Sequence, residues 1–234
     1  LSNNLDPEVA ERPDDLVVAR PEGLYCPPGN FYIDAWRPVE RSLITHGHSD
    51  HARMGHAHYL AHTDSAGVLR ARLGEQINLQ TLPYGEAIEH NGVTISLHPA
   101  GHVLGSAQVR LEHQGRVWVV SGDYKTEADG TCAPFVPVPC QVFVTESTFG
   151  LPIYRWDETA IVIRDILAWW NANRETGRAS VIFCYTLGKA QRLLAELPPQ
   201  TVYVHGMMLA MIDAYREAGV QLPEVKPVIE RSGR

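Results

Sequence analysis

The stretch SLITHGHSDHARMGH, residues 42–56, decides the fold. It opens on the apolar run SLIT, whose length and composition predict a buried strand. Four histidines and one aspartate then follow within eleven positions. The sequence therefore places a group of side chains that can bind metal in a loop at the end of a strand.

The spacing of these side chains suits metal binding. Gly47 lets the backbone turn sharply, so that His46 and His48 can point at one position. Asp50 and His51 follow directly. Zinc binds imidazole nitrogen and carboxylate oxygen at about 2.0–2.2 Å, so these four side chains can supply parts of two adjacent metal sites. The alternative is a surface loop that happens to be rich in histidine.

Composition narrows the class of protein. The chain has 234 residues with 44% hydrophobic content, enough for one large domain or two small ones. It contains no apolar run long enough to span a membrane, and no secretory signal opens it. The net charge of −7 argues against indiscriminate binding to nucleic acid. Four scattered cysteines without a C-x-x-C pair argue against a disulfide scaffold, so we expect a reducing, cytoplasmic location.

The pattern of the chain changes near residue 150. Residues 1–14 are polar and are expected to form a loose leader, whereas residues 15–150 alternate short apolar runs with turn residues. Residues 151–234 alternate strands with helices, which predicts a parallel α/β unit. Strands are expected at Leu16–Ala19, Phe31–Asp34, Ser42–Thr45, His58–Ala61, Val93–His98, Ala107–Glu112, Arg116–Ser121, Val142–Thr145, ASVIFCY (179–185) and TVYVHG (201–206). Helices are expected at residues 64–73, 157–174, 187–197 and 208–218.

The pattern H-x-H-x-D-H resembles the signature loop of the metallo-β-lactamase fold hydrolases. The resemblance implies a third histidine and a bridging aspartate, each after a later strand. The segment LHPAGHVLGSAQV offers both His98 and His102, and the G-H-x-L-G-S context favours His102; Asp123 follows VWVVSG. We expect His56, His58 and His62 to be ordinary surface or strand residues. The ligand sets implied by the resemblance are His46, His48 and His102 for one metal, Asp50 and His51 for the other, and Asp123 between them.

A second motif points to one branch of this fold. VFVTESTFGLP, residues 142–152, resembles motif A of the β-CASP branch, in which an acidic residue precedes an inserted α/β domain; here the acid is Glu146. The expected fold class is α/β: a metallo-β-lactamase-type αββα sandwich followed by a β-CASP domain, incomplete at the C-terminus. Family members normally continue beyond a position such as Arg234, with one histidine near an Asp-His pair and a last histidine for the second metal.

Several segments together resemble the bacterial ligase-associated DNA exonucleases. The resemblance implies a nuclease in DNA repair that uses two divalent metals, Zn²⁺ or alternatively Mn²⁺, and a metal-bridging hydroxide. Asp50, Asp123 and Glu146 would be its catalytic carboxylates. The implied partners are DNA, an ATP-dependent DNA ligase and a helicase, with no membrane. The alternatives are a β-CASP ribonuclease that processes RNA 3′ ends, a small-molecule hydrolase, and a binding module without activity.

Two further positions are candidates for substrate binding. Gly188 and Lys189 open an expected helix after an expected strand, so amide N–H groups and an ammonium could hold a backbone phosphate. His205 ends another strand and could face the substrate. A plain helix start with a solvated lysine, and a structural histidine, are the alternatives.

Overall fold

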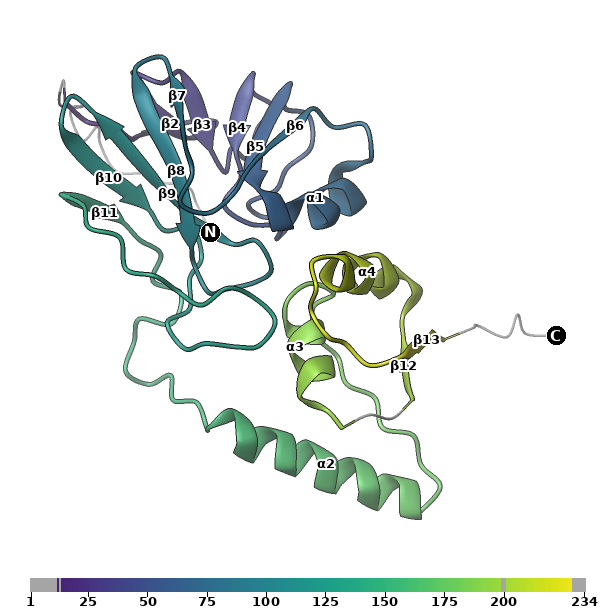
Figure 1. Cartoon of the computed structure of the whole chain (residues 1–234). Helices are drawn as coiled ribbons and strands as arrows, with labels where there is room; N and C mark the ends of the chain where they lie inside the picture. Colours follow the sequence, from purple (N-terminus) through teal and green to yellow (C-terminus); the bar gives the residue numbers. More distant parts are fainter. Residues whose placement is uncertain (1–11, 13, 199–200, 229–234) are drawn as a thin grey trace.

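Two β-sheets pack face to face in the computed structural model, which describes residues 12, 14–198 and 201–228 (Figure 1). The predicted leader lies almost entirely outside these residues. The first sheet has the order β1-β2-β3-β4-β5-β6, and β3 to β6 run parallel to one another. Its strands are β1 (Val18–Arg20), β2 (Gly23–Cys26), β3 (Phe31–Ile33), β4 (Arg41–Leu43), β5 (His58–His62) and β6 (Leu79–Leu82).

The second sheet has the order β11-β10-β9-β8-β7. The expected hairpin between β9 and β10 is confirmed, with Gln114 and Gly115 at φ values of 50° and 76° in its turn. Because β8 and β10 are both antiparallel to β9, they point the same way, and β11 is parallel to β10. The strands are β7 (Ala87–His90), β8 (Val93–Pro99), β9 (Ala107–His113), β10 (Arg116–Val120) and β11 (Val142–Val144).

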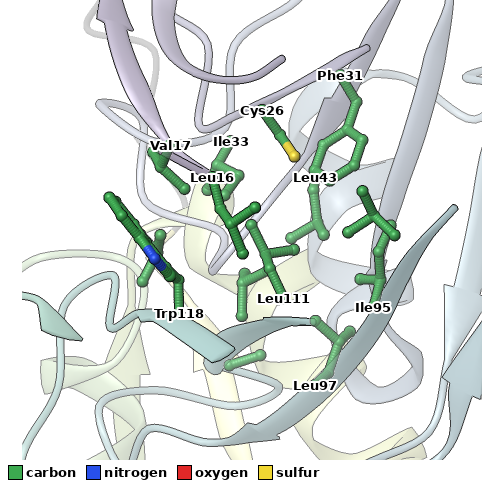
Figure 2. Close-up of a cluster of buried hydrophobic side chains, with 14 of the residues drawn as sticks. Leu16, Val17, Cys26, Phe31, Ile33, Leu43, Ile95, Leu97, Leu111 and Trp118 are labelled. Atoms are coloured by element: carbon green, nitrogen blue, oxygen red, sulfur yellow. The ribbon is translucent and has the colours of Figure 1, made fainter. Parts of the chain in front are cut away.

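The main hydrophobic core lies between the two sheets (Figure 2). Ile33 and Leu43 from the first sheet meet Leu97 and Leu111 from the second, and all four are fully or almost fully buried. The outer face of the first sheet is covered by η1 (Thr63–Ser65) and α1 (Ala66–Leu73), which together form the helix expected at residues 64–73. The predicted fold class, a sandwich of the metallo-β-lactamase type, is confirmed.

A helical unit follows the sandwich. Its elements are α2 (Thr159–Glu175), α3 (Lys189–Glu196), β12 (Val202–Val204), η2 (Gly206–Met208), α4 (Leu209–Glu217) and β13 (Val225–Pro227), and β12 pairs with β13 in parallel. The division into domains at residue 150 stays a prediction. No helix in the described part of the chain is long and apolar enough to cross a bilayer. All four cysteines are free.

The strand predicted for ASVIFCY is wrong. No strand among the described residues pairs with residues 179–185, and Phe183 is 95% exposed. A continuous apolar run is typical of a strand with sheet neighbours and covered faces. The sequence pattern carries that propensity, but the pairing partners that would make it a buried strand are absent from the described structure.

A cluster of buried side chains joins the helical unit to the sandwich. Val68 of α1 and Leu104 pack against Leu187 and against Met211 and Tyr215 of α4. The Tyr215 side chain is completely buried, and its hydroxyl accepts a hydrogen bond from the Leu104 N–H at 3.1 Å. The contact links α4 directly to the loop that carries His102.

We expect Tyr215→Phe to lower the free energy of unfolding by about 1–3 kcal/mol, because the buried Leu104 N–H would lose its acceptor. Urea denaturation followed by circular dichroism measures the change. Tyr203→Phe is the matched control, since Tyr203 is 64% exposed. Equal stability of the two variants would contradict a structural role for the Tyr215 hydroxyl.

Candidate metal centre

The loops that carry the candidate ligands all follow strands that end at one edge of the sandwich. The HGHSDH loop follows β4, His102 follows β8, and Asp123 follows β10. The two sheets approach closely here: a Cβ on Gly122, whose φ is +57°, would lie 2.6 Å from Thr45 Oγ1. Glycine is therefore required at this position for the Asp123 loop to reach the His46 loop.

Four donor atoms converge at this edge. One ligand atom from each of His46, His48, His102 and Asp123 lies within 4.8 Å of the others. His48 Nδ1 is 3.0 Å from His46 Nε2 and 3.1 Å from His102 Nε2. Asp123 Oδ2 is 3.8 Å from His46 Nε2 and 3.6 Å from His102 Nε2. A tetrahedral site with bonds of about 2.0–2.2 Å has edges of about 3.3–3.6 Å, so this donor set fits one divalent metal ion.

The protonation states also suit metal binding. Burial, followed by the neighbouring imidazoles, lowers the pKa of His46 well below its usual value, and burial likewise lowers the pKa of His48. Burial and the nearby His48 lower the pKa of His102 to about 4. Neutral imidazoles with free lone pairs are the form that binds metal.

A second group of donors lies on the other side of Asp123. Its Oδ1 atom is 3.2 Å from His51 Nε2, which is 3.8 Å from Asp50 Oδ2. The Asp50 side chain is 72% exposed. Asp123 thus directs one oxygen toward the three imidazoles and the other toward His51, the arrangement required of a carboxylate between two ions.

In this second group, the pKa values of His51 and Asp123 depend on each other. Burial lowers the pKa of His51, but its hydrogen bonds with Asp123 and Asp34 outweigh burial and raise the pKa to about 10. The hydrogen bond from His51 lowers the pKa of Asp123, against the effect of burial. The hydrogen bonds with the two carboxylates therefore favour the protonated form of His51. A metal ion bound to His51 Nε2 would replace the proton that His51 shares with Asp123.

Asp34 and Thr45 orient two of the candidate ligands, and the sequence did not reveal them. Asp34 follows β3 with φ of 47°, and its Oδ2 accepts hydrogen bonds from the Thr45 hydroxyl at 2.6 Å and from His51 Nδ1–H at 2.7 Å. The Thr45 oxygen lies 3.1 Å from His46 Nδ1. The two imidazoles are thereby held with Nε2 directed toward Asp123. The only signal in the sequence is a polar residue that ends an apolar strand.

We expect Asp34→Asn to weaken metal binding by about 10–100-fold, because an NH₂ group in place of Oδ2 cannot accept from Thr45 and His51. Asparagine tolerates the left-handed backbone at this position, so the fold should persist. Competition with a chromophoric chelator measures the affinity. Asp165→Asn, on the exposed surface of α2, is the control; wild-type affinity in Asp34→Asn would contradict the positioning role.

Glu146 shares a cavity with the second group of donors. This cavity, of about 330 Å³, is lined by Asp34, Asp50, His51, Asp123 and Glu146 among others. Glu146 follows β11, and its Oε2 accepts a hydrogen bond from the Thr148 N–H at 2.6 Å. The structure therefore brings Glu146 to the same cavity as Asp50 of the signature loop and Asp123 of the loop after β10.

The proposed substrate-binding residues lie in different surroundings. The Gly188 N–H donates to Gln191 Oε1 at 2.8 Å and the Lys189 N–H to the Leu187 carbonyl at 3.3 Å, so the amides expected to hold a phosphate are already engaged. The Lys189 ammonium, 6.0 Å from the centroid of the Tyr185 ring, keeps its predicted role as a hypothesis.

His205 lies outside the group of converging donors. Its Nδ1 atom accepts a hydrogen bond from the Met207 N–H at 3.2 Å and caps η2. The predicted substrate contact of His205 stays a prediction.

Four other histidines of the first part make contacts away from the metal centre. His98, the competing candidate, lies 3.0 Å from Ser96 Oγ on its own strand. His62 stacks on Tyr84 with ring centroids 3.4 Å apart, and His56 is buried. None of these, nor His58, belongs to the group of converging donors among the described residues.

Comparison with known proteins gives independent information on the family. No family model matches the chain. A protein named probable DNA ligase from Opitutus terrae is 33% identical over 205 residues, which cover 86% of this chain and 20% of that protein. The endoribonuclease ysh1 of Emericella nidulans is 34% identical over 134 residues, covering 53% of this chain and 15% of the relative. Subunit 3 of the cleavage and polyadenylation specificity factor of Dictyostelium discoideum is 32% identical over 128 residues, covering 51% and 15%.

One solved structure supports the fold alone. A protein of unknown function from Enterococcus faecalis matches with a TM-score of 0.57 and 13% identity, covering 83% of this chain and 52% of the other. The chain spans a fifth or less of the length of the three curated relatives named above.

The two-sheet sandwich with histidines and an aspartate converging from three loops at one edge defines the metallo-β-lactamase fold. Within that fold, the similarity to the ysh1 and cleavage-factor proteins agrees with the motif at Glu146. The chain belongs to the β-CASP branch of the metallo-β-lactamase family.

Proposed function

We propose that this chain forms part of a metal-dependent nuclease that hydrolyses DNA phosphodiester bonds, as an exonuclease in DNA repair. The observation that carries the proposal is the position of Asp123, whose two oxygens face two separate groups of donors. Two divalent ions at such a carboxylate are typical of enzymes that cleave phosphate esters.

The donor groups would divide between two ions. His46, His48, His102 and Asp123 would hold one, and Asp50, His51 and Asp123 the other. Imidazole and carboxylate ligands suit Zn²⁺, with Mn²⁺ as the alternative. When bound, such a pair supplies a water that ionises near neutral pH and offsets the negative charge of the reacting phosphate.

Two side chains would act on the substrate itself. Glu146 lines the cavity beside Asp50 and Asp123, where its carboxyl group can give a proton to the leaving oxygen. The Lys189 ammonium, at the start of α3, would bind a backbone phosphate. Asp123 and Asp50 hold their oxygens in place for the ions and repel the phosphate when the ions are absent.

The preference for DNA and the partners rest on similarity. The relative that matches most of this chain is named a probable DNA ligase, whereas the ribonucleases match about half of it. The relative that contains a region similar to this chain is named as a ligase, which supports a functional link to an ATP-dependent DNA ligase. A helicase partner rests on family resemblance alone. Free cysteines are compatible with the cytoplasmic location that such a repair enzyme would have.

Matched DNA and RNA oligonucleotides, each labelled at one end, test the proposal with the complete gene product. We expect stepwise shortening of the DNA that requires a divalent metal and stops on chelation, with little change in the RNA. Preferential cleavage of RNA would favour the ribonuclease alternative. Hydrolysis of a thioester or lactam, with both nucleic acids intact, would favour a small-molecule hydrolase.

A further inference from the structure

A carbonyl group from the helical unit contacts the metal centre directly. Leu187 lies just before α3, 139 positions from His48 in the sequence, and its carbonyl oxygen is 3.3 Å from His48 Nε2. A carbonyl oxygen can only accept, so His48 Nε2 must carry the proton. The other ring nitrogen, Nδ1, is then unprotonated and presents its lone pair to His46 and His102.

The Leu187 side chain packs under the same loop. It is 2% exposed and lies in the cluster that joins α1 to α4. A Cβ on Gly47 would lie 3.2 Å from Leu187 Cδ2 and 2.5 Å from Val68 Cγ1. The signature loop therefore packs against both the sandwich and the helical unit, and a displacement of Leu187 would change the position of His48.

The backbone that aims this carbonyl has an unusual conformation. Gly188 has φ of 86° and ψ of −76°, and the Lys189 N–H donates to the Leu187 carbonyl at 3.3 Å, which makes a γ-turn of the rare positive-φ type. Such strained turns persist only where the surroundings hold them, and they cluster at functional sites.

Two neighbours hold the turn in place. The completely buried Gln191 side chain accepts from the Gly188 N–H at 2.8 Å and donates to the Thr186 carbonyl at 2.9 Å. On the other side, a Cβ on Gly188 would lie 2.6 Å from Val103 Cγ1 and 3.8 Å from His48 Nε2. Only glycine combines this backbone conformation with this close approach.

We propose that the Leu187–Gly188 turn is a positioning element of the metal centre, which holds His48 in the tautomer that presents Nδ1 to the first metal ion. Metal-binding histidines commonly donate their other N–H to a carbonyl or carboxylate, and this partner sets their orientation. The proposal rests on the proposed metal centre, and it adds that the helical unit, through a backbone atom, completes the site built by the sandwich.

The test compares Gly188→Ala with Gly177→Ala in the complete gene product. Both glycines have positive φ, 86° and 71°, but a Cβ on Gly177 meets nothing within 4 Å. Zn²⁺ affinity is measured by chelator competition, and the visible spectrum of bound Co²⁺ reports the geometry of the ligands. We expect Gly188→Ala to lower affinity by about 10–100-fold and to change the spectrum, with Gly177→Ala unchanged.

Val103→Ala provides a rescue. It removes the Cγ1 atom that the new methyl group would meet, so Gly188→Ala/Val103→Ala should bind Zn²⁺ more tightly than Gly188→Ala alone. Wild-type affinity and spectrum in Gly188→Ala, or equal losses in Gly177→Ala, would overturn the proposal.

A measurement on the unaltered protein keeps the test independent of folding. Two-dimensional ¹H–¹⁵N spectra of the histidine rings in the metal-loaded protein should show His48 protonated at Nε2. Protonation at Nδ1, or no metal binding at all, would overturn the inference. A protein that binds metal with this tautomer but degrades no nucleic acid would overturn the proposed function and leave the positioning role standing.

Discussion

Asp123→Ala should reduce the metal-dependent DNA degradation of the complete gene product by about 10³-fold or more. The variant removes the carboxylate whose oxygens face both groups of donors, at 3.6–3.8 Å on one side and 3.2 Å on the other. Loss of the metal pair costs several kcal/mol of transition-state stabilisation, and each 1.4 kcal/mol corresponds to about a tenfold change in rate. Initial rates on an end-labelled duplex measure the effect.

Metal content separates this explanation from a general loss of structure. We expect Asp123→Ala to bind less than the wild-type amount of metal by elemental analysis, while its circular dichroism spectrum stays unchanged. Asp213→Ala is the control, because its carboxylate is 63% exposed on α4. Full activity in Asp123→Ala would remove the basis for a hydrolytic centre at this position.

Local sequence patterns predicted the parts of the site that depend on strand ends. His102 follows a seven-residue strand that alternates apolar and polar residues, and Asp123 follows the apolar run VWVV, so their position near strand ends followed from the pattern. The hairpin turn at Gln114 and Gly115 was also predicted from neighbouring residues alone. In each case the information lies within about ten residues of the position concerned, which is the range over which periodicity and turn preferences act.

The strands that sequence analysis missed are short or weakly apolar. β2 and β13 span only four and three residues, and β7, with the sequence AIEH, buries no side chain fully. Their pairing depends on neighbours far along the chain. The opposite error occurred at ASVIFCY. These residues have high strand propensity, but no strand in the described structure pairs with them. Propensity alone therefore did not produce a strand.

The supporting contacts of the site could not be predicted for a different reason. Asp34 follows β3, whereas its partners His51 and Thr45 follow the parallel strand β4, and no spacing rule in the sequence relates these residues. The contact of His48 with Leu187 involves a backbone carbonyl, which every residue possesses, so no residue type marks it. The pattern at Gly188 predicts a helix start that binds phosphate, whereas in the structure Gly188 is the centre of a γ-turn, and the N–H groups of Gly188 and Lys189 already have acceptors.

Glu146→Gln should lower kcat by about 10²–10⁴-fold while leaving metal content at the wild-type level. A positioned general acid contributes a factor of this size, and glutamine cannot give up a proton to the leaving oxygen. Glutamine can still accept the hydrogen bond that the Thr148 N–H donates to Glu146 Oε2, so the turn after β11 should keep its shape. The variant therefore separates a chemical role for Glu146 from a role in holding this turn.

The comparison of two variants makes the result specific. Glu127→Gln removes an exposed carboxylate, four positions after Asp123 in the sequence, that does not line the cavity, and it should retain wild-type kcat. Single-turnover rates on one DNA substrate, measured with saturating metal, give the effect on the chemical step. If Glu146→Gln cleaves at the wild-type rate, the carboxyl group serves only to cap the turn, and the proton for the leaving oxygen must come from another group in the cavity.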